Sequence, residues 1–576
     1  MSQFYDQASL VMVPSGYKAG KVYSQKPLST DGELTFTRNS NATRVNADGL
    51  VEKVRQNLAL YSQDFSNAAW TKNNTAATVD TISNDTSNSI HRFYQATGPF
   101  TGTGELSFSI EFKYIDHQYI SFGLTDDSNY RVQLVVDLIN HTITNTELNA
   151  GTILLSSSFV SVGDGWYKLS GTINATSAWG NNIYALGVLL NGSTFTTATY
   201  LGTGTGVYIR KAQVEFGVNT DYIPTTSAAV SVGPTANVPR LDYSGGCPAL
   251  KLEPQRTNNA TFNERLASGT FSYVDGVTFT ANSITAPTGY TQGCKFEKTG
   301  SGVADRYDAL GGGPMSQSIF VKAGTSSRIV LAIEGNVTGS VIFDLSTLGI
   351  TNYGTATGKI VDFGNGWYRC IANYSSTPTS GPITRIYLPD TGYLYCYGYQ
   401  MELNASYETS LIPTLGASVT RLGDEIYKTG IASLIGQSEG TVFIDFEINS
   451  PDNSASKWIF FLKGVPGDYI GFYTNGSDKF IVEVAYLSAT VFISASINVV
   501  LGQRYKMALG YKINDFALYV NGSQIATDSS GNVPACSSIN YLYNTTTANV
   551  GATKHNQALL FKTRLSNQQL AEITAL

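Results

Sequence analysis

The sequence predicts an all-β protein built from several β-domains in series, and three observations support this prediction. Of the 576 residues only 14% are charged and 12% are aromatic, with 35 Tyr and 56 Gly. Tyr, Val and Thr favour strands, and Gly favours the turns between them. Long runs of helix-forming residues at helical spacing are nearly absent. At roughly 150 residues a domain, the length suggests about three or four domains.

A signature that recurs in the same order indicates an internal duplication. Asp-Gly-Trp-Tyr-Lys-Leu at 164–169 has a counterpart in Asn-Gly-Trp-Tyr-Arg-Cys at 365–370. Further along, Tyr-Ile-Arg-Lys-Ala-Gln-Val-Glu at 208–215 matches Tyr-Cys-Tyr-Gly-Tyr-Gln-Met-Glu at 395–402, and Ile-Pro-Thr follows in both copies. Three matches in one order predict two copies of one β-domain.

The chemistry of the signature sets the expected domain boundaries. Asp-Gly and Asn-Gly tolerate positive φ and make tight turns, after which one ring of the Trp-Tyr pair is expected in the core. The proline of Ile-Pro-Thr ends strand pairing because it has no N–H. The expected segments are an N-terminal segment at 1–56, sandwich 1 at 57–232, a connector at 233–258, sandwich 2 at 259–421 and a C-terminal sandwich at 422–576.

The C-terminal part has a pattern of its own. Residues 441–448 alternate strictly, with Val442, Ile444, Phe446 and Ile448 on one face and Phe443, Asp445 and Glu447 on the other. Asn-Gly at 521–522 joins two strand-like runs as a hairpin. A short helix is expected only at 566–575, with Ser566 as its N-cap.

Charge and composition exclude several classes of protein. The formal net charge is −6, from 37 basic and 43 acidic residues. Without a basic cluster, we expect no nucleic-acid partner. No apolar run reaches about 18 residues, so we expect no membrane insertion. Residues 1–6 lack the basic start and apolar run of a secretory signal, which predicts synthesis in a cytoplasm. The five cysteines are sparse and odd in number, so we expect reduced thiols.

The candidate catalytic groups do not form a complete set. Gly-Gln-Ser-Glu-Gly at 436–440 has the spacing of a nucleophile elbow, but an alternating strand follows where a helix is required. Asp445 and Glu447 lie on one face of a strand, ~6–7 Å apart, which is near the carboxylate separation of glycosidases. We expect this pair on a solvated sheet face, and we predict no catalytic residue and no enzymatic activity.

Metal sites are not predicted either, and neither is a cofactor. The acidic run at 126–129 could ligate calcium through oxygens, but no Asp-x-Asp-x-Asp-Gly loop frames it. Glycan binding needs exposed rings, which stack on sugars, beside amides that bond to hydroxyls. Trp179, Tyr473 and Asn475 lie on expected loops and are the candidate glycan contacts, with core packing or an oligomer contact as the alternative.

Several stretches resemble phage structural proteins of the head-spike or fibre kind. They are the start of the chain at 9–24, Leu-Thr-Phe-Thr-Arg at 34–38, Ala-Thr-Arg-Val at 42–45, the opening of the first repeat at 60–70, Pro-Arg-Leu-Asp-Tyr at 239–243 and Leu-Glu-Pro-Gln-Arg-Thr-Asn at 252–258. In that family the Arg-Leu-Asp-Tyr connector directly follows Ala-Thr-Arg-Val. Here a whole sandwich separates them, which fits an inserted or duplicated domain.

The two repeats resemble carbohydrate-binding jelly rolls more loosely. The C-terminal sandwich resembles concanavalin A-like or laminin-G-like domains, through Tyr-Val-Asn-Gly at 519–522 and the tail at 564–572. Laminarinase-like glycosidases share that fold and carry Glu-x-Asp-x-Glu. The position of their nucleophile is Phe443 here, so the resemblance implies that retaining hydrolysis fails.

These resemblances imply a function in a virus particle. The expected protein is a structural component of a phage virion, a head or tail fibre or spike made in the host cytoplasm, with a role in attachment to the host or to a glycan. Residues 1–56 are expected to bind other virion proteins, and the chain to form a homo-oligomer, a trimer or dimer, which buries sheet edges. A polysaccharide is the expected ligand. The alternative function is a polysaccharide-degrading virion enzyme, a depolymerase.

Overall fold

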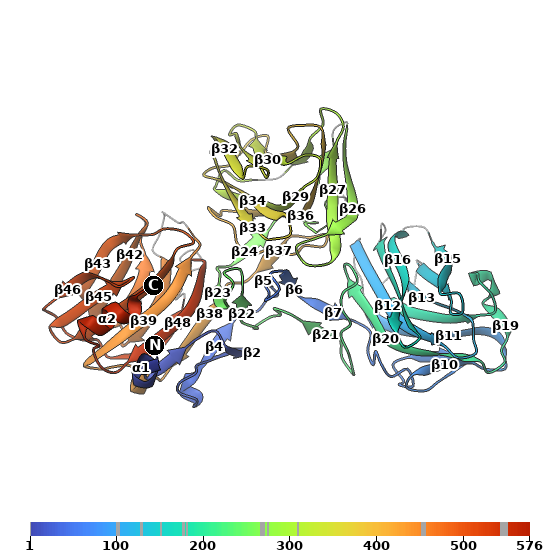
Figure 1. The fold of residues 1–576 in the computed structure, drawn as a ribbon, viewed down its shortest axis with the longest axis horizontal. Coiled ribbons are helices and arrows are strands. Elements are labelled where there is room, and N and C mark those ends of the chain that lie inside the picture. The colour runs from blue at the N-terminus through green and yellow to red at the C-terminus, as the bar shows by residue number, and fades with distance from the viewer. Residues whose placement is uncertain are drawn as a thin grey trace.

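A computed structural model shows three β-sandwiches that meet at a narrow centre (Figure 1). Strands make up 57% of it and helices 4%, so the predicted all-β class is confirmed. Within the described part, no helix is long and apolar enough to cross a membrane. The structure describes residues 2–98, 104–126, 131–149, 152–175, 179, 182–264, 266, 271–273, 276–307, 310–450, 457–541 and 551–576.

Sandwich 1 packs a six-stranded sheet against a seven-stranded one, and apolar side chains of both sheets form its core. The six-stranded sheet runs in the order β16 (Thr152–Gly163), β17 (Trp166–Ala175), β12 (Gly104–Tyr114), β20 (Gly206–Phe216), β10 (Thr81–Asn84) and β9 (Thr75–Ala77). The other runs β15 (Thr142–Leu148), β14 (Arg131–Asp137), β13 (Tyr119–Asp126), β18 (Ile183–Leu190), β11 (Asn88–Gly98) and β19 (Thr199–Leu201), with β8 (Thr71–Asn73) also on β11.

Sandwich 2 repeats the strand order of sandwich 1 except at one sheet edge, where β25 (Ser272–Tyr273) corresponds to β8 and β19 has no counterpart. One sheet runs β33 (Ala356–Asp362), β34 (Trp367–Tyr374), β29 (Met315–Ala323), β36 (Gly392–Leu403), β27 (Thr291–Lys298) and β26 (Val277–Thr285). The other runs β32 (Gly349–Gly354), β31 (Gly339–Asp344), β30 (Arg328–Glu334), β35 (Ile383–Tyr387), β28 (Ala304–Tyr307) and β25 (Ser272–Tyr273). The repeated tryptophans Trp166 and Trp367 open β17 and β34, which occupy the same place in the two sandwiches.

The third sandwich contains both ends of the chain. Its eight-stranded sheet runs β22 (Arg240–Asp242), β23 (Ala249–Leu252), β48 (Thr553–Phe561), β39 (Glu439–Ile448), β44 (Arg504–Lys512), β45 (Asp515–Val520) and β46 (Ser523–Asp528), with β1 (Leu10–Met12) also on β48. Its nine-stranded sheet runs β2 (Gly16–Lys18), β3 (Lys21–Tyr23), β4 (Glu33–Thr37), β38 (Glu425–Thr429), β47 (Cys536–Tyr541), β40 (Lys457–Gly464), β41 (Tyr469–Thr474), β42 (Lys479–Tyr486) and β43 (Ala489–Asn498).

This pairing differs from the expected division of the chain. The segment 1–56 was expected to stand apart, but β1 pairs with β48 and β4 pairs with β38, so its strands belong to the third sandwich. Strands β22 and β23 of the expected connector join the same sandwich. Apolar residues such as Leu10 and Leu34 draw the segment inward, because they are fully buried in the third core.

Sandwiches 1 and 2 are therefore insertions into the third sandwich. The chain enters and leaves sandwich 1 on the paired strands β7 (Arg55–Asn57) and β21 (Val230–Val232). It enters and leaves sandwich 2 on β24 (Arg256–Asn258) and β37 (Val419–Arg421). Between the third sandwich and sandwich 1, β5 (Thr43–Val45) and β6 (Val51–Lys53) form a hairpin at the centre of the molecule (Figure 1).

Two helices lie on the outer face of the eight-stranded sheet. They are α1 (Ser2–Gln7) and α2 (Asn567–Thr574), and their Phe4, Leu570 and Ile573 pack against Phe443 and Tyr519. The predicted cap is confirmed, because the Ser566 hydroxyl accepts a hydrogen bond from the Gln569 N–H at 3.2 Å.

The predicted tight turns are also present. Asp164 and Asn365 have φ of 53°, and Asn521 has φ of 48°, which are left-handed values that Asn and Asp tolerate. Trp367 is 3% exposed, but it is buried outside the core of sandwich 2, together with Phe320 and Tyr397. The ring of the pair that packs against this core is that of Tyr368, which is partly buried. In sandwich 1, Trp166 and Tyr167 are both half-buried and neither belongs to the core, so the expectation of a core ring is wrong there.

Candidate functional site

The three residues predicted to contact a glycan have different surroundings in the structure. Trp179 is 3% exposed and belongs to the core of sandwich 1, so its ring offers no surface for stacking. Asn475 uses its side-chain oxygen to accept from the N–H groups of Ser477 and Lys479, at 3.0 and 3.1 Å, and so closes a turn. Tyr473 lies at the end of β41, in a cluster of four aromatic residues.

We call this cluster the aromatic platform; it comprises Trp458, Phe461, Tyr469 and Tyr473. On β41 the platform tyrosines alternate with the core residues Ile470 and Phe472, so they point to the outer face of the nine-stranded sheet. On β40 a bulge between Trp458 and Phe460 lets Trp458 and Phe461 both lie outside the core. The Trp458 ring centre lies 4.5 Å from that of Tyr473 and 4.8 Å from that of Phe461. Phe461 and Tyr469 are 5.3 Å apart.

Gly471 leaves room for the indole of Trp458 beside β41. A Cβ atom at Gly471 would come within 2.5 Å of the Cζ3 atom of Trp458, so a larger residue would displace the ring. The half-buried indole therefore lies against β41 at Gly471. Half-buried rings held in this way are preformed surfaces that lose little side-chain entropy on binding.

The Glu483 carboxylate on β42 completes the platform. It is almost fully buried and accepts hydrogen bonds from the hydroxyls of Tyr473 and Thr490, both at 2.7 Å. Burial and the nearby Glu483 raise the pKa of both Tyr469 and Tyr473, so the two phenols stay protonated at neutral pH. A ring that presents an apolar face beside fixed polar groups suits a sugar, which has apolar C–H faces and hydroxyl edges.

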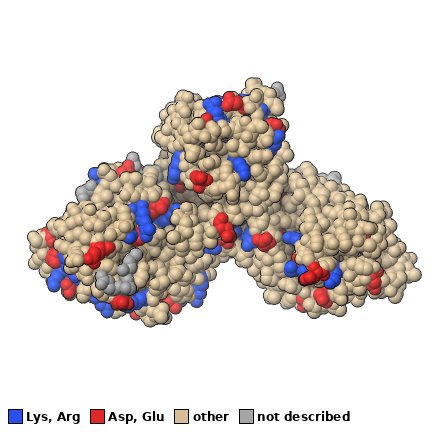
Figure 2. Space-filling view, viewed as in Figure 1, with Lys and Arg blue, Asp and Glu red and all other residues tan. Residues whose placement is uncertain are grey.

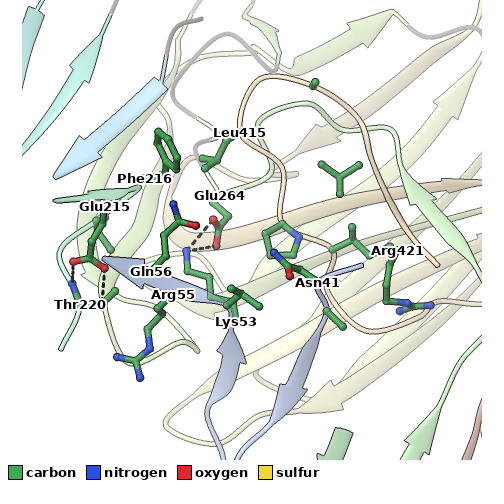
Figure 3. Close-up of a pocket in the computed structure, with 17 residues that line it drawn as sticks. Asn41, Lys53, Arg55, Gln56, Glu215, Phe216, Thr220, Glu264, Leu415 and Arg421 are labelled. Carbon is green, nitrogen blue, oxygen red and sulfur yellow. Dashed lines mark hydrogen bonds and ion pairs between the residues drawn. The ribbon is translucent and has the colours of Figure 1, made fainter. Parts of the chain in front are cut away.

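A hollow lies at the junction of sandwich 1, sandwich 2 and the central hairpin (Figure 3). This cavity of about 380 Å³ is lined by Phe216 and Leu415 on its apolar side. On its polar side the Lys53 ammonium and the Glu264 carboxylate form an ion pair of 2.8 Å. Glu215 at its margin accepts from the Thr220 N–H at 2.9 Å. These polar groups are paired within the protein, which is typical of a seam between domains.

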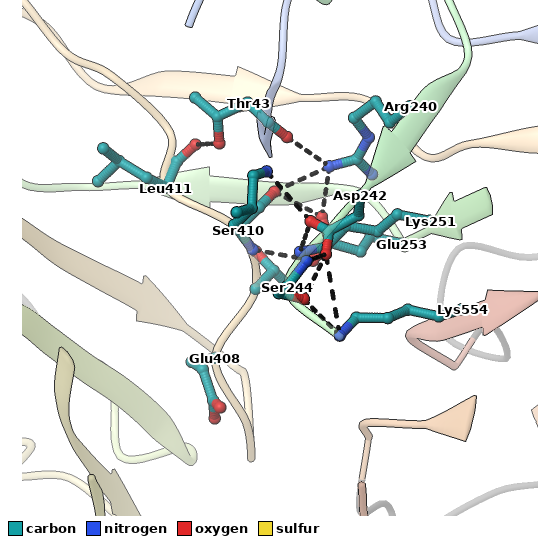
Figure 4. A network of polar contacts seen from close by, with 12 residues as sticks. Thr43, Arg240, Asp242, Ser244, Lys251, Glu253, Glu408, Ser410, Leu411 and Lys554 are labelled. Carbon is teal, nitrogen blue, oxygen red and sulfur yellow. Dashed lines mark hydrogen bonds and ion pairs between the residues drawn. The ribbon is translucent and has the colours of Figure 1, made fainter. Parts of the chain in front are cut away.

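The resemblance motifs meet in a buried network of charges at the root of sandwich 2 (Figure 4). Arg240, from Pro-Arg-Leu-Asp-Tyr, donates to the Glu253 carboxylate at 2.7 Å and to the Ser410 hydroxyl at 2.9 Å. Arg421 donates to the same two groups, at 2.6 and 2.8 Å. Asp424 pairs with Arg240 and, at 3.0 Å, with Arg38. These motifs are thus a structural junction.

Electrostatics keep this network charged. Against the effect of burial, the neighbouring carboxylates raise the pKa of Arg240, and the neighbouring cations hold that of Glu253 well below its usual value. Asp242 is also buried, yet Lys251 and Lys554 lower the pKa of its carboxyl. Buried charges are tolerated when each has a partner, so the network fixes one arrangement of the segments that it joins.

Of the two candidate catalytic carboxylates, Asp445 does not lie on a solvated sheet face, so that expectation is wrong for this residue. Its side chain is fully buried and binds the Arg504 guanidinium through both oxygens, at 2.7 and 2.6 Å. Glu447 lies 3.6 Å from Lys554. At the Gly-x-Ser-x-Gly run, β39 begins at Glu439 as the sequence indicates, so a strand follows Ser438.

Among the described residues, no group of three or more His, Cys, Asp or Glu side chains is placed to hold a metal ion. Of the acidic run at 126–129, residues 127–129 lie outside the described part of the chain. The cysteines are free thiols, and Cys247 is the exposed one.

No family model matches this sequence, and no curated protein matches it. Among solved structures, the Ruminococcus gnavus IT-sialidase CBM40 bound to alpha2,3 sialyllactose is 16% identical, with a TM-score of 0.22 over 25% of this chain and 86% of that chain. The botulinum neurotoxin serotype D binding domain is 12% identical, with a TM-score of 0.22 over 26% and 40%. The LG1-3 region of the laminin alpha2 chain is 8% identical, with a TM-score of 0.19 over 84% and 97%. TM-scores this low carry no functional argument.

Proposed function

We propose that the protein attaches a larger assembly to a polysaccharide, and that the aromatic platform of the third sandwich is the contact. The observation that carries the proposal is the half-buried Trp458 indole, which lies against Gly471 between Phe461 and Tyr473, beside the hydrogen bond from Tyr473 to Glu483. Rigid aromatic residues with polar neighbours are the groups on which binding energy concentrates.

Binding without hydrolysis is favoured over a depolymerase. A retaining glycosidase needs two free carboxyl groups about 5–5.5 Å apart that face the substrate. Here Asp445 is occupied by Arg504, and Phe443 stands where the related glycosidases have their nucleophile. Phe443 is also buried under the helices on the outer face of the eight-stranded sheet.

Affinity electrophoresis of the full chain in gels that contain candidate surface polysaccharides tests the platform. Trp458→Ala should weaken binding about 30-fold, since removing a central tryptophan costs about 2 kcal/mol. Tyr473→Phe keeps the ring but removes the donor to Glu483, so a smaller loss is expected. Tyr353→Ala, which removes an exposed tyrosine from sandwich 2, is the matched control. Equal binding by the Trp458 and Tyr353 variants would exclude the platform, and release of reducing ends would favour the depolymerase.

The larger assembly is, in this proposal, a phage particle in which the chain is a head or tail fibre or spike. The phage-like segments at the start of the chain and in the connector support it, together with the three β-sandwiches and the low content of charged residues. Since β1 and β4 belong to the third sandwich, we propose that particle proteins contact 1–56 at the edge of the nine-stranded sheet, where β2 stands last. Mass spectrometry and immunogold labelling of purified particles should find the chain there; particles without it would contradict the assignment.

A further inference from the structure

A small cavity lies in the seam between sandwich 2 and the third sandwich, with a volume of about 140 Å³. The outer face of β33 and β34 contributes Lys359 and Arg369 to its lining, and the third sandwich contributes Lys251 on β23 and Lys554 on β48. Figure 2 shows basic and acidic side chains on both sides of this seam, where the upper lobe meets the left-hand lobe. How far these charges balance determines which ligand the cavity suits.

The three lysines that line the cavity are each held by a carboxylate within the protein. The pairs are Lys251 with Asp242 at 3.2 Å, Lys359 with Glu408 at 2.8 Å and Lys554 with Glu447 at 3.6 Å. Glu253, which also lines the cavity, accepts hydrogen bonds from Arg240 and Arg421. Because these groups are paired, the remaining charge of the lining is that of Arg369.

Arg369 is a buried cation that forms no ion pair with a carboxylate of the described residues. It is 6% exposed, its Nη2 donates to the Ser318 hydroxyl at 2.9 Å, and its buried Nε has no hydrogen-bond partner in the described part of the chain. The carboxylates whose charge acts on it, Glu253, Glu402 and Glu408, accept hydrogen bonds from other residues. An unpaired buried charge is costly, so we expect the guanidinium to take an anionic partner from outside the chain.

Sandwich 1 has an acid at the position where sandwich 2 has an apolar ring. Lys168 follows the repeated tryptophan by two residues, as Arg369 does, and it stands opposite Glu111 on β12. Arg369 stands opposite Phe320 on β29 instead. Lys168 is half-buried, whereas Arg369 is buried. The basic residue of the repeat is thus enclosed more deeply in sandwich 2, and there the sheet supplies no carboxylate to face it.

The size of the cavity and the shape of the guanidinium define the ligand. At about 30 Å³ for each water-sized group, the cavity has room for roughly four or five such groups, which matches a tetrahedral oxyanion. A guanidinium binds the oxygens of such an anion in pairs, through charge-assisted hydrogen bonds. We propose that this cavity binds one sulfate or phosphate group, with Arg369 as its anchor. The site is separate from the aromatic platform, which lies on the nine-stranded sheet of the third sandwich.

Thermal unfolding of the full chain, with sodium sulfate exchanged for sodium chloride at constant ionic strength, tests the proposal. The midpoint of the unchanged protein should rise by about 2–4 °C and reach a plateau at millimolar sulfate. Arg369→Met removes the charge but keeps most of the side-chain length, and it should abolish the rise. Arg328→Met, at a half-buried arginine of sandwich 2 that pairs with Asp390, is the matched control and should keep it. No rise in the unchanged protein, or an equal rise in all three proteins, would overturn the proposal.

A second variant keeps the test decisive if Arg369→Met does not fold, which circular dichroism would show. Arg369→Lys retains the charge, but an ammonium cannot bind two oxygens side by side as a guanidinium does. This variant should therefore need about tenfold more sulfate to reach half of the rise. An unchanged half-saturation concentration would contradict the role of Arg369 as anchor.

The source of the oxyanion is tested by titrating inorganic phosphate and a sulfated monosaccharide in the same way. Half-saturation by the sulfate ester at an about tenfold lower concentration than by inorganic sulfate would assign the group to a substituent on a saccharide. Saturation by the inorganic anions alone would assign it to a free ion. Trp458→Ala should leave the response to sulfate unchanged, so failure of this proposal is distinguishable from failure of the aromatic platform.

Discussion

Sandwiches 1 and 2 have nearly the same strand order but different outer surfaces. They share a set of buried hydrogen bonds that we call the clasp, in which Gln213 and Thr225 of sandwich 1 correspond to Gln400 and Thr414 of sandwich 2. In the clasp of sandwich 1, Gln213 accepts from the Ile223 N–H at 2.7 Å, and Gln400 accepts from the Ile412 N–H at 2.7 Å in sandwich 2. The clasp contains most of the repeated signature. Duplication therefore preserved the residues that close the sandwich on itself.

The outer sheet faces differ because their neighbours differ. In sandwich 2, Phe320 and Tyr397 are opposite each other and are buried with Trp367 under Val51 of the central hairpin. The same ladder position in sandwich 1 holds Glu111 and Arg210, whose guanidinium lies 3.9 Å from the Trp166 ring centre. The covered face is thus apolar, whereas the corresponding face of sandwich 1 has an ion pair and a cation–π contact, so the residues at this position match the packing of each sandwich.

The largest expected effect concerns the roots of the two sandwiches. Glu253→Gln leaves the buried Arg240 and Arg421 short of a negative charge and should destabilise the chain by about 3–5 kcal/mol. Glu52, five residues before Asn57 as Glu253 is before Asn258, forms a half-buried pair with Arg44 at 2.7 Å. Glu52→Gln should cost about 1 kcal/mol or less. Calorimetric unfolding of both variants measures this, and equal losses would mean that the two roots are equivalent.

The repeated tryptophans should differ next. Trp367→Ala removes a buried ring and its N–H donor to the Thr285 carbonyl at 3.1 Å, for a loss of about 3 kcal/mol. Trp166→Ala removes a half-buried ring and should cost about 1 kcal/mol. Thermal denaturation monitored by near-ultraviolet circular dichroism compares them. A larger loss at Trp166 would show that the open face is covered in solution.

Removing one hydrogen bond of the clasp should lower the stability of both sandwiches by similar amounts. The hydroxyls of Thr225 and Thr414 donate to the carbonyls of Ala59 and Ala260, at 2.5 and 2.6 Å. Thr225→Val and Thr414→Val should each cost about 1–3 kcal/mol, because each leaves buried polar groups without their partner. Hydrogen exchange of β20 and β36 resolves the two effects. Unequal loss of exchange protection in β20 and β36 would indicate that the same hydrogen bond contributes differently to the stability of the two sandwiches.

The smallest expected difference between the two sandwiches is in how much stability each loses at acid pH. Burial lowers the pKa of His117 in sandwich 1, and sandwich 2 contains no histidine. Because the unfolded histidine titrates near about 6.5, it binds more protons than the folded one, and stability is lost as the pH falls below that value. Exchange protection of sandwich 1 should drop between pH 7.5 and 5.5, with little change in sandwich 2. His117→Gln should abolish the difference; its persistence would assign the effect elsewhere.

Local sequence patterns predicted the strands, turns and repeats, but not the partners of the terminal strands. Alternation at 441–448 and the Asn-Gly turn at 521–522 are local signals of backbone geometry. The pairing of Leu10 with Leu560 has no local signal, since a short apolar run specifies burial but not against which strand. The N-terminal segment was consequently predicted to stand apart.

The candidate site was predictable only in part for a related reason. Tyr473 stands out because it precedes Asn-Gly, but Trp458 lies in the run Lys-Trp-Ile-Phe-Phe-Leu-Lys, where continuous apolar residues hide which face is outward. Trp458 meets Tyr473 only because β40 and β41 are neighbours. Trp179 lies beside Gly and Asn, which suggested an exposed loop, yet its side chain is in the core.

The meeting of β1 with β48 dictates an order of events during synthesis. The first strands leave the ribosome long before their partners exist, while sandwiches 1 and 2 are each complete as soon as their own last strand emerges. The third sandwich can close only after β48 has been synthesised, when sandwiches 1 and 2 are already complete. Until then the apolar side chains of β1–β4 are exposed to solvent in the nascent chain, so we expect chaperones to bind this stretch. A chain that terminates before β48 would keep these side chains exposed and would be prone to aggregate.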